Sequence, residues 1–180
     1  LLDTRMRIDL VPFSSCSGVE SLSFSLSPES SSGLRLTVQL QGLIASDLEV
    51  ANQVGRREFG LWQHHCFELF IAEAGSTAYW ELNIAPNGNW NCFEFDDYRL
   101  HQRESDRCVL SAFRAARRGR IFELDAKILT NPRFQASGAA LSLGAAAILK
   151  TASGLNYFSI RHGATPDFHD TNHHIPWTLQ

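Results

Sequence analysis

The stretch Ser21-Leu22-Ser23-Phe24-Ser25-Leu26-Ser27 alternates a serine with a large apolar residue at every step. Successive side chains of a β-strand point to opposite faces, so the three apolar residues would share one face and the serines the other. The same period of two runs through residues 34–40 (LRLTVQL) and residues 6–10 (MRIDL). These three segments are therefore predicted to be strands with one buried face.

Turn-forming residues separate further strand-like segments. Residues 28–33 are a serine-rich turn, and Pro86-Asn87-Gly88 is a second turn signal. Residues 42–60 lack alternation and indicate a long connection, with a helical turn at residues 46–51. No segment of ten or more residues shows a convincing helical period. The other predicted strands cover residues 66–72, 79–84, 90–95, 108–115, 121–129, 139–150 and 155–161.

The number and spacing of these strands decide the predicted fold class. Roughly ten short strands with turns between them favour a β-sandwich over any α/β architecture. The 180 residues contain no visible repeat or linker. The sequence therefore predicts an all-β fold, an antiparallel and jelly-roll-like β-sandwich, with residues 1–180 forming a single domain.

Composition narrows the classes of partner. A formal net charge of -3 and a pI of about 6.2 disfavour nucleic acid, which calls for a basic surface. The chain has one local basic run, made of Arg114, Arg117, Arg118 and Arg120. This run is more readily interpreted as a solvated turn than as a phosphate-binding patch. The longest apolar segment, residues 139–149, is interrupted by Ser142 and Gly144 and is shorter than a membrane span, so no membrane partner is expected.

The cysteines indicate a compartment. Cys16, Cys66, Cys92 and Cys108 lie far apart and form no C-x-x-C pair. Cys66 and Cys92 fall inside apolar strand-like runs, where a free thiol behaves as a small buried hydrophobe. No charged segment followed by an apolar one is visible at the N-terminus. We therefore expect free thiols and a cytoplasmic location.

Five blocks of sequence are distinctive. They are GLWQHHCFELF at residues 60–70, YWELNIAPNGNW at residues 79–90, FDDYR at residues 95–99, YFSIRH at residues 157–162 and PDFH at residues 166–169. Together they resemble the DOMON-like domains related to family 9 carbohydrate-binding modules. That pattern has a Trp ahead of a C-F-E-L-F strand, then a Y-x-E-x-N strand, a P-x-G-x-W turn and a closing Tyr-Arg. The resemblance extends over nearly the whole chain.

The resemblance implies a jelly-roll-like sandwich that holds a terminal sugar between tryptophans, while charged and amide side chains bind its hydroxyls. Trp62 matches the first tryptophan of the family, Glu68 the carboxylate six residues later, and Arg99 the arginine. The second tryptophan has no aligned counterpart, because Trp177 lies beyond the P-D-F-H block. Fold alone does not establish function, so the residues need their own argument.

The strand pattern supports part of the same site. Glu68 lies opposite the apolar face of its strand, and Glu81 and Asn83 lie opposite the apolar face of the next one. Arg99 could balance the charge by forking onto one of the carboxylates. Sugar hydroxyls both donate and accept hydrogen bonds, and the C–H face of a sugar stacks on an aromatic ring. The predicted ligand-binding residues are therefore Trp62, Glu68, Glu81, Asn83 and Arg99.

A structural role remains open for each of these groups. Glu68, Glu81 and Arg99 could instead form an ordinary surface ion-pair cluster. Trp62 could be a rim residue that packs a loop. Trp80 is expected in the core rather than at a ligand, and the same holds for Trp90.

A second candidate site lies near the C-terminus. It comprises Asp167, His169, Asp170, His173 and His174. Zinc accepts imidazole and carboxylate ligands, so a metal-assisted enzyme is an alternative function. The spacing fits no zincin motif, and in the resembling family the P-D-F-H block closes the fold, with its Asp and His bonded to backbone. His64 and His65 would point to opposite strand faces, and Asp96-Asp97 is a weak calcium signal. No metal is predicted.

Catalytic motifs are missing from the sequence. It contains no G-x-S-x-G elbow, P-loop or G-x-G-x-x-G segment, and a glycosidase role for Glu68 and Glu81 would depend on their separation. Haem binding through a Met and a His is disfavoured, because Met6 is the only methionine.

The predicted function is non-catalytic binding of a saccharide or a similar polyhydroxylated ligand, without a cofactor. A metal-assisted enzyme and a protein-interaction sandwich are the alternatives, and the oligomeric state is left open.

Overall fold

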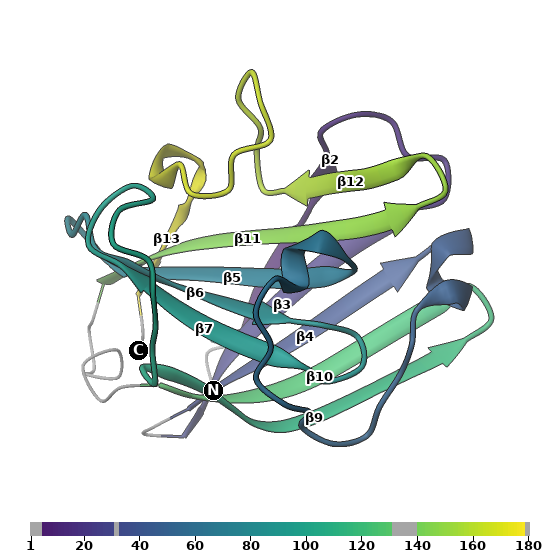
Figure 1. Cartoon of the computed structure of the whole chain (residues 1–180), viewed down its shortest axis with the longest axis horizontal. Coiled ribbons are helices and arrows are strands. Elements are labelled where there is room, and N and C mark those ends of the chain that lie inside the picture. The colour runs from purple at the N-terminus through teal and green to yellow at the C-terminus, as the bar shows by residue number, and fades with distance from the viewer. Residues whose placement is uncertain (1–4, 31–32, 131–139, 179–180) are drawn as a thin grey trace.

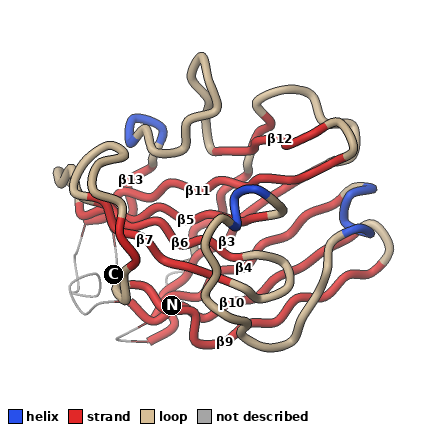
Figure 2. The backbone as a smooth tube through the Cα atoms, in the orientation of Figure 1, coloured by secondary structure: helices blue, strands red, loops and turns tan. Residues whose placement is uncertain are grey.

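The computed structural model describes residues 5–30, 33–130 and 140–178 (Figure 1). Antiparallel strands form two sheets that share one hydrophobic core, and loops with short 3₁₀ turns connect the strands (Figure 2). This arrangement confirms the predicted β-sandwich.

The strands follow a different order in space than along the chain. The first sheet has the order β1 (Met6–Asp9), β3 (Ser21–Ser30), β4 (Gly33–Gln41), β10 (Ile121–Thr130) and β9 (Cys108–Arg118). The second has the order β2 (Val11–Pro12), β12 (Gly154–Ser159), β11 (Ala140–Thr151), β5 (Cys66–Glu73), β6 (Tyr79–Ile84), β7 (Trp90–Phe95) and β8 (Arg103–Glu104), with β13 (Ile175–Thr178) also paired to β11. The described 3₁₀ turns are η1 (Leu43–Asp47), η2 (Leu61–Gln63) and η4 (Thr171–His173). In the described part of the chain, no helix has the length and apolar character needed to cross a membrane.

The alternation in the opening stretch builds the core between the sheets. Leu22, Phe24 and Leu26 are at most 2% exposed and lie on the inner face of β3. Across the core, the ring of Phe67 on β5 stacks on Phe122 of β10, with 5.6 Å between the ring centroids. Removal of this apolar surface from water is the main force that holds the two sheets together.

The central strand β5 is buried on both faces. Phe67 and Leu69 enter the core between the sheets, whereas Cys66 and Phe70 belong to a second apolar cluster on the outer face. The sequence predicted an open face here. In the structure, residues of η2 and of the C-terminal segment, including Phe168, cover it. Any polar group on this face is therefore removed from water.

Several boundaries differ from the predicted ones. η1 begins at Leu43, ahead of the turn expected at residues 46–51, because Gly42 has a φ of 148° that only glycine adopts easily. The short strands β2, β8 and β13 were not predicted, and β2 and β8, with two residues each, are too short to show a period. Residues 31–32 of the expected turn and residue 139 of the expected strand lie outside the described residues.

All four arginines of the basic run are exposed, on β9 and in the turn that follows it, and two of them make contacts with other segments. Nη1 of Arg117, on β9, donates hydrogen bonds to the carbonyl oxygens of Ser46 and Leu48 at 2.5 and 2.9 Å. Arg120, beside β10, pairs with Glu20. Arg117 therefore joins the end of η1 and the residue after it to the β9–β10 hairpin.

Tryptophans and cysteines complete the core. Trp90 is buried and Trp80 is half-buried against the core between the sheets, as predicted. All four cysteines are free thiols, and Cys66, Cys92 and Cys108 are buried.

Candidate functional site

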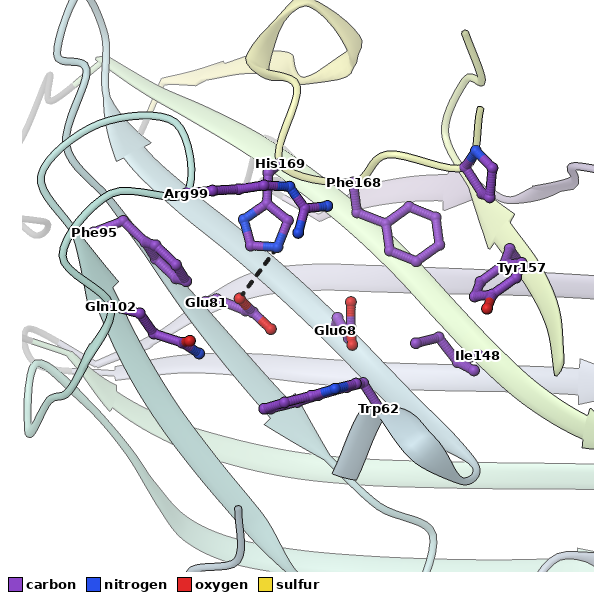
Figure 3. A pocket seen from close by; sticks show the side chains of 11 residues that line it. Trp62, Glu68, Glu81, Phe95, Arg99, Gln102, Ile148, Tyr157, Phe168 and His169 are labelled. Atoms are coloured by element: carbon purple, nitrogen blue, oxygen red, sulfur yellow. Dashed lines mark ion pairs between the residues drawn. The ribbon is translucent and has the colours of Figure 1, made fainter. Parts of the chain in front are cut away.

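A cavity of about 380 Å³ opens on the outer face of the second sheet (Figure 3). Small-molecule sites typically measure roughly 300–1,000 Å³, so this one has room for a small ligand. Its lining residues come from η2, β5, β6, β7, β11, β12, the loop after β7 and the C-terminal segment: Trp62, Glu68, Glu81, Phe95, Arg99, Gln102, Ile148, Tyr157, Pro166, Phe168 and His169.

Four of the five residues predicted for the site line this cavity: Trp62, Glu68, Glu81 and Arg99. Asn83 does not. It is 0% exposed, and its Nδ2 donates to Oε1 of Glu81 at 2.8 Å. The amide turns along its own strand toward the carboxyl group, so Asn83 orients Glu81 and does not face the cavity.

Strand register brings the two carboxyl groups together. Glu68 on β5 stands opposite Asn83 on β6, and Phe70 on β5 stands opposite Glu81. Since residues two apart on a strand share a face, both carboxyl groups point to the outer face on adjacent strands. Figure 3 shows both between Trp62 on one side and Arg99 and His169 on the other.

Trp62 stands at the rim of the cavity, in η2. Gly60, with a φ of 83°, makes the left-handed turn that leads into η2. The half-buried indole packs edge-on against Phe59 and Phe93, at centroid distances of 4.9 and 5.9 Å. These contacts fix the ring while leaving part of it open to a ligand.

Glu68 and Glu81 form the floor of the cavity, and burial controls their charge. Glu68 is 3% exposed and Glu81 is 4% exposed. Burial raises the pKa of Glu81 to about 7. Burial, and then the charge of Glu81, raise the pKa of Glu68 well above its usual range. At neutral pH the floor therefore holds at least one carboxyl proton, because two adjacent charges without solvent would be too costly.

Arg99 pairs with a different partner from the one that the sequence predicted. Its Nη2 donates to Oδ1 of Asp167 at 2.9 Å, and no described contact joins it directly to Glu68 or Glu81. Tyr98 Oη donates to the other oxygen of Asp167. We call this group, Tyr98, Arg99 and Asp167, the clasp. It ties the loop after β7 to the C-terminal segment, which the sequence could not place beside that loop.

A chain of hydrogen bonds fixes His169. The backbone N–H of Arg99 donates to Oη of Tyr79 at 3.2 Å, and Tyr79 Oη lies 2.6 Å from Nδ1 of His169. The Tyr79 hydroxyl thus links the backbone of Arg99 to the imidazole ring and holds the ring in place. Nε2 lies 3.7 Å from Oε2 of Glu81. Burial, and then the charge of Arg99, lower the pKa of His169 to about 4, so it is neutral at physiological pH.

Aromatic residues that sequence reasoning did not assign to the site form much of its wall. Tyr157 and Phe168 line one end, and Phe95 and Gln102 line the other (Figure 3). Phe168 belongs to the P-D-F-H block, so that block was a usable signal, although it was interpreted as a closing segment. Gln102 lies in a loop without any pattern, and no sequence signal identifies it.

The C-terminal Asp and His residues hold their own segment together. Asp170 caps η4 by accepting from the backbone N–H of Asn172 at 3.0 Å, and Nε2 of His174 lies 3.2 Å from the carbonyl oxygen of Phe168. Across the described ranges, no group of three or more His, Cys, Asp or Glu side chains could hold a metal ion. Nothing in this geometry favours the metal-assisted alternative.

Comparisons with known proteins address the fold. No family model matches the chain, and no curated protein matches it. A protein from Bacteroides uniformis ATCC 8492, provisionally assigned as carbohydrate-binding, superposes with a TM-score of 0.67 at 12% identity, covering 96% of this chain and 87% of that chain.

Family 9 carbohydrate-binding modules from Caldicellulosiruptor kristjanssonii also match. The module in complex with cellotriose has a TM-score of 0.58 and 11% identity, covering 96% of this chain and 80% of that one. The module in complex with glucose has a TM-score of 0.58 and 10% identity, covering 96% and 82%. At these identities the similarity establishes a shared β-sandwich fold.

Proposed function

We propose that this protein binds a saccharide in the cavity on the outer face of its second sheet. The observation that carries the proposal is the combination of a half-buried tryptophan at the rim with two buried carboxyl groups on the floor. An aromatic ring takes the C–H face of a sugar, and carboxyl groups take its hydroxyls. No other described cavity combines these features.

The rest of the wall suits the same ligand. Arg99 and Gln102 present hydrogen-bond donors at the rim, and His169 directs its Nε2 toward Glu81. Phe168 and Tyr157 supply aromatic surface in place of the second tryptophan of the resembling family. Polar groups with both donors and acceptors, set among aromatic rings, match a polyhydroxylated molecule better than an apolar one.

The comparisons support the proposal through the fold. Family 9 modules with this sandwich bind cellotriose and glucose. We extend the proposal to a DOMON-like relationship and a jelly-roll arrangement, which the blocks at residues 60–70, 79–90 and 166–169 support. A cytoplasmic location remains part of the proposal and is supported by the free thiols.

Replacement of Trp62 by alanine tests the proposal. Loss of stacking should weaken binding of glucose or cellotriose by about 1–3 kcal/mol. This range is the one typical of a nucleobase stacked on an aromatic side chain. Titration calorimetry with both sugars would measure the change. Unaltered affinity in Trp62→Ala, or no binding of any mono- or disaccharide by the native protein, would contradict the proposal.

Trp80→Ala is the matched control. Trp80 lies on β6, on the strand face opposite Glu81, and packs against the core between the sheets. Its removal should lower stability and leave sugar affinity unchanged. A parallel measurement of thermal unfolding would show that the loss in Trp62→Ala comes from the site.

A further inference from the structure

The floor of the cavity has more hydrogen-bond acceptors than donors. Oε2 of Glu81, which lines the cavity, is buried and has no hydrogen-bond partner. Oδ1 of Asn83 also has none, but it does not face the cavity. Glu68, 3% exposed, adds a second carboxyl group beside Glu81. Buried polar atoms are normally satisfied, so an unpartnered acceptor that faces a cavity indicates a missing donor.

No positively charged side chain of the described residues supplies the missing donor on the floor. In the described part of the chain, no lysine or arginine forms an ion pair with either floor carboxyl group. Arg99 is the nearest guanidinium, but its Nη2 is bonded to Asp167 at 2.9 Å and its side chain is 50% exposed. The imidazole of His169 is held neutral, and its Nε2 is 3.7 Å from Glu81, beyond hydrogen-bond distance.

We propose that the ligand of this cavity carries a primary ammonium group, and that the site prefers an amino sugar to the corresponding neutral sugar. This inference rests on the proposed saccharide site and names the class of sugar that it takes. The ammonium group lies on the floor, where it donates to Oε2 of Glu81 and to Glu68. The sugar ring lies between Trp62 and the wall that contains Phe168.

The physical reason is the cost of an unpaired buried charge. A buried carboxylate without a partner is unfavourable, whereas one that accepts from a cation forms a short, charge-assisted hydrogen bond. An ammonium group has three donors, which matches a floor of acceptors. A hydroxyl at the same position offers one donor and no charge. An acetylated amine has lost the charge and is bulkier.

Titration of the floor agrees with this geometry. Without a cation, burial raises the pKa of both Glu81 and Glu68, so the floor keeps at least one carboxyl proton at neutral pH. The groups that face them are His169 from the C-terminal segment, Arg99 from the loop after β7 and Cys66 from β5. An ammonium ion would favour the ionised carboxyl groups, so binding should release protons to the buffer.

Calorimetry with three sugars tests the inference. Glucosamine is expected to bind at least about tenfold more tightly than glucose at pH 7. Glucose is the comparison because it has a neutral hydroxyl in place of the amino group. N-acetylglucosamine should bind no better than glucose. The heat of glucosamine binding should depend on the ionisation enthalpy of the buffer, which reports the released protons. Glu81→Gln should abolish the preference for glucosamine, and Glu68→Gln should reduce it.

The outcomes separate this inference from the proposed function. If glucose binds as tightly as glucosamine, the ammonium preference is wrong and the saccharide site stands. Cyclohexylamine supplies an amine without a sugar. If it binds in a Glu81-dependent manner while no sugar does, the cation site stands and the saccharide function falls. If neither sugars nor amine bind, both are wrong. Thermal unfolding of each variant verifies that it is folded.

Discussion

Glu81 lies on the cavity floor and Asp167 in the clasp, and their surroundings shift their pKa values in opposite directions. Burial raises the pKa of Glu81 to about 7, and among the described residues a single side chain, Asn83, donates a hydrogen bond to it. Burial also opposes ionisation of Asp167, but hydrogen bonds from Tyr98 and Arg99 outweigh it and lower the pKa of Asp167. At the scale of single residues, the balance between burial and the donors and positive charge nearby decides whether a carboxyl group is ionised.

Glu81 should therefore make stability depend on pH. Between 4.5, its ordinary pKa, and about 7, folded Glu81 keeps a proton that the unfolded chain releases. A rise in pH then favours the unfolded state, and the free energy of unfolding of the native protein relative to Glu81→Gln should fall by up to about 1.4 kcal/mol per pH unit. Urea unfolding across this range measures the difference. Glu73→Gln, at the exposed end of β5, is the control. A difference that stays flat or rises would contradict this assignment.

The thiols should differ in reactivity according to burial. Burial raises the pKa of Cys66, and the contact with Cys92, followed by burial, raises that of Cys108. Cys16 alone among the four is partly exposed. A colorimetric thiol reagent should modify about one thiol in the native protein and the other three only in urea. Cys16→Ser should remove the fast phase. Fewer than four thiols in urea would indicate a disulfide and an oxidising compartment.

At the scale of elements, the clasp connects two loops that lie far apart in sequence. Arg99 and His101 have φ values of 53° and 57°, a left-handed conformation that is costly outside glycine. Asp167 offsets this cost by accepting from both Tyr98 and Arg99. The C-terminal segment therefore adds a contact to the loop after β7, which is also held by the pairing of β7 with β8 and by the ion pair between Arg103 and Glu94 of β7.

Loss of the clasp should loosen both loops without unfolding the sandwich. In Asp167→Asn, amide hydrogen exchange should become faster in residues 96–103 and 163–174, while the global free energy of unfolding should change by less than about 1 kcal/mol, because the pair is partly exposed. Asp9→Asn, which breaks the exposed pair between Arg7 and Asp9, is the control and should leave these loops unchanged. Unaltered exchange in Asp167→Asn would show that other contacts hold the loops.

At the scale of the whole molecule, the two sheets share one core, but only the second sheet also forms the cavity. The first sheet contributes its inner face to packing, with Phe24 and Phe122 around Phe67. The second sheet uses its inner face for the same core and its outer face for the cavity, so its central strands are buried on both sides. The core between the sheets and the cavity therefore lie on opposite faces of one sheet.

Phe67→Ala should show how much the core between the sheets contributes to stability. Loss of a fully buried ring that contacts two strands of the opposite sheet should cost about 3–5 kcal/mol in the free energy of unfolding. Phe59→Ala, at a ring that is 66% exposed, should change the free energy of unfolding by no more than about 0.5 kcal/mol. Urea unfolding measures both. A loss below about 1 kcal/mol in Phe67→Ala would contradict the packing role of this ring.

The sequence by itself determined the fold class and much of the inner core. The alternation around Phe24 is a local property, because the pleat of a strand assigns successive side chains to opposite faces whatever the partner strand is. The same rule placed Glu68 and Glu81 on one outer face, and block resemblance identified Trp62 and Arg99. These predictions needed only neighbours along the chain.

Only the tertiary structure decided how the site is closed and charged. No local pattern indicates that Phe168 and His169 cover β5. Nor does one indicate that Arg99 pairs with Asp167 instead of Glu68, or that Asn83 donates to Glu81. Burial of the carboxyl groups, and hence their pKa values, depends on segments about a hundred residues away. Period and composition report which face a side chain occupies, whereas long-range packing decides what covers that face.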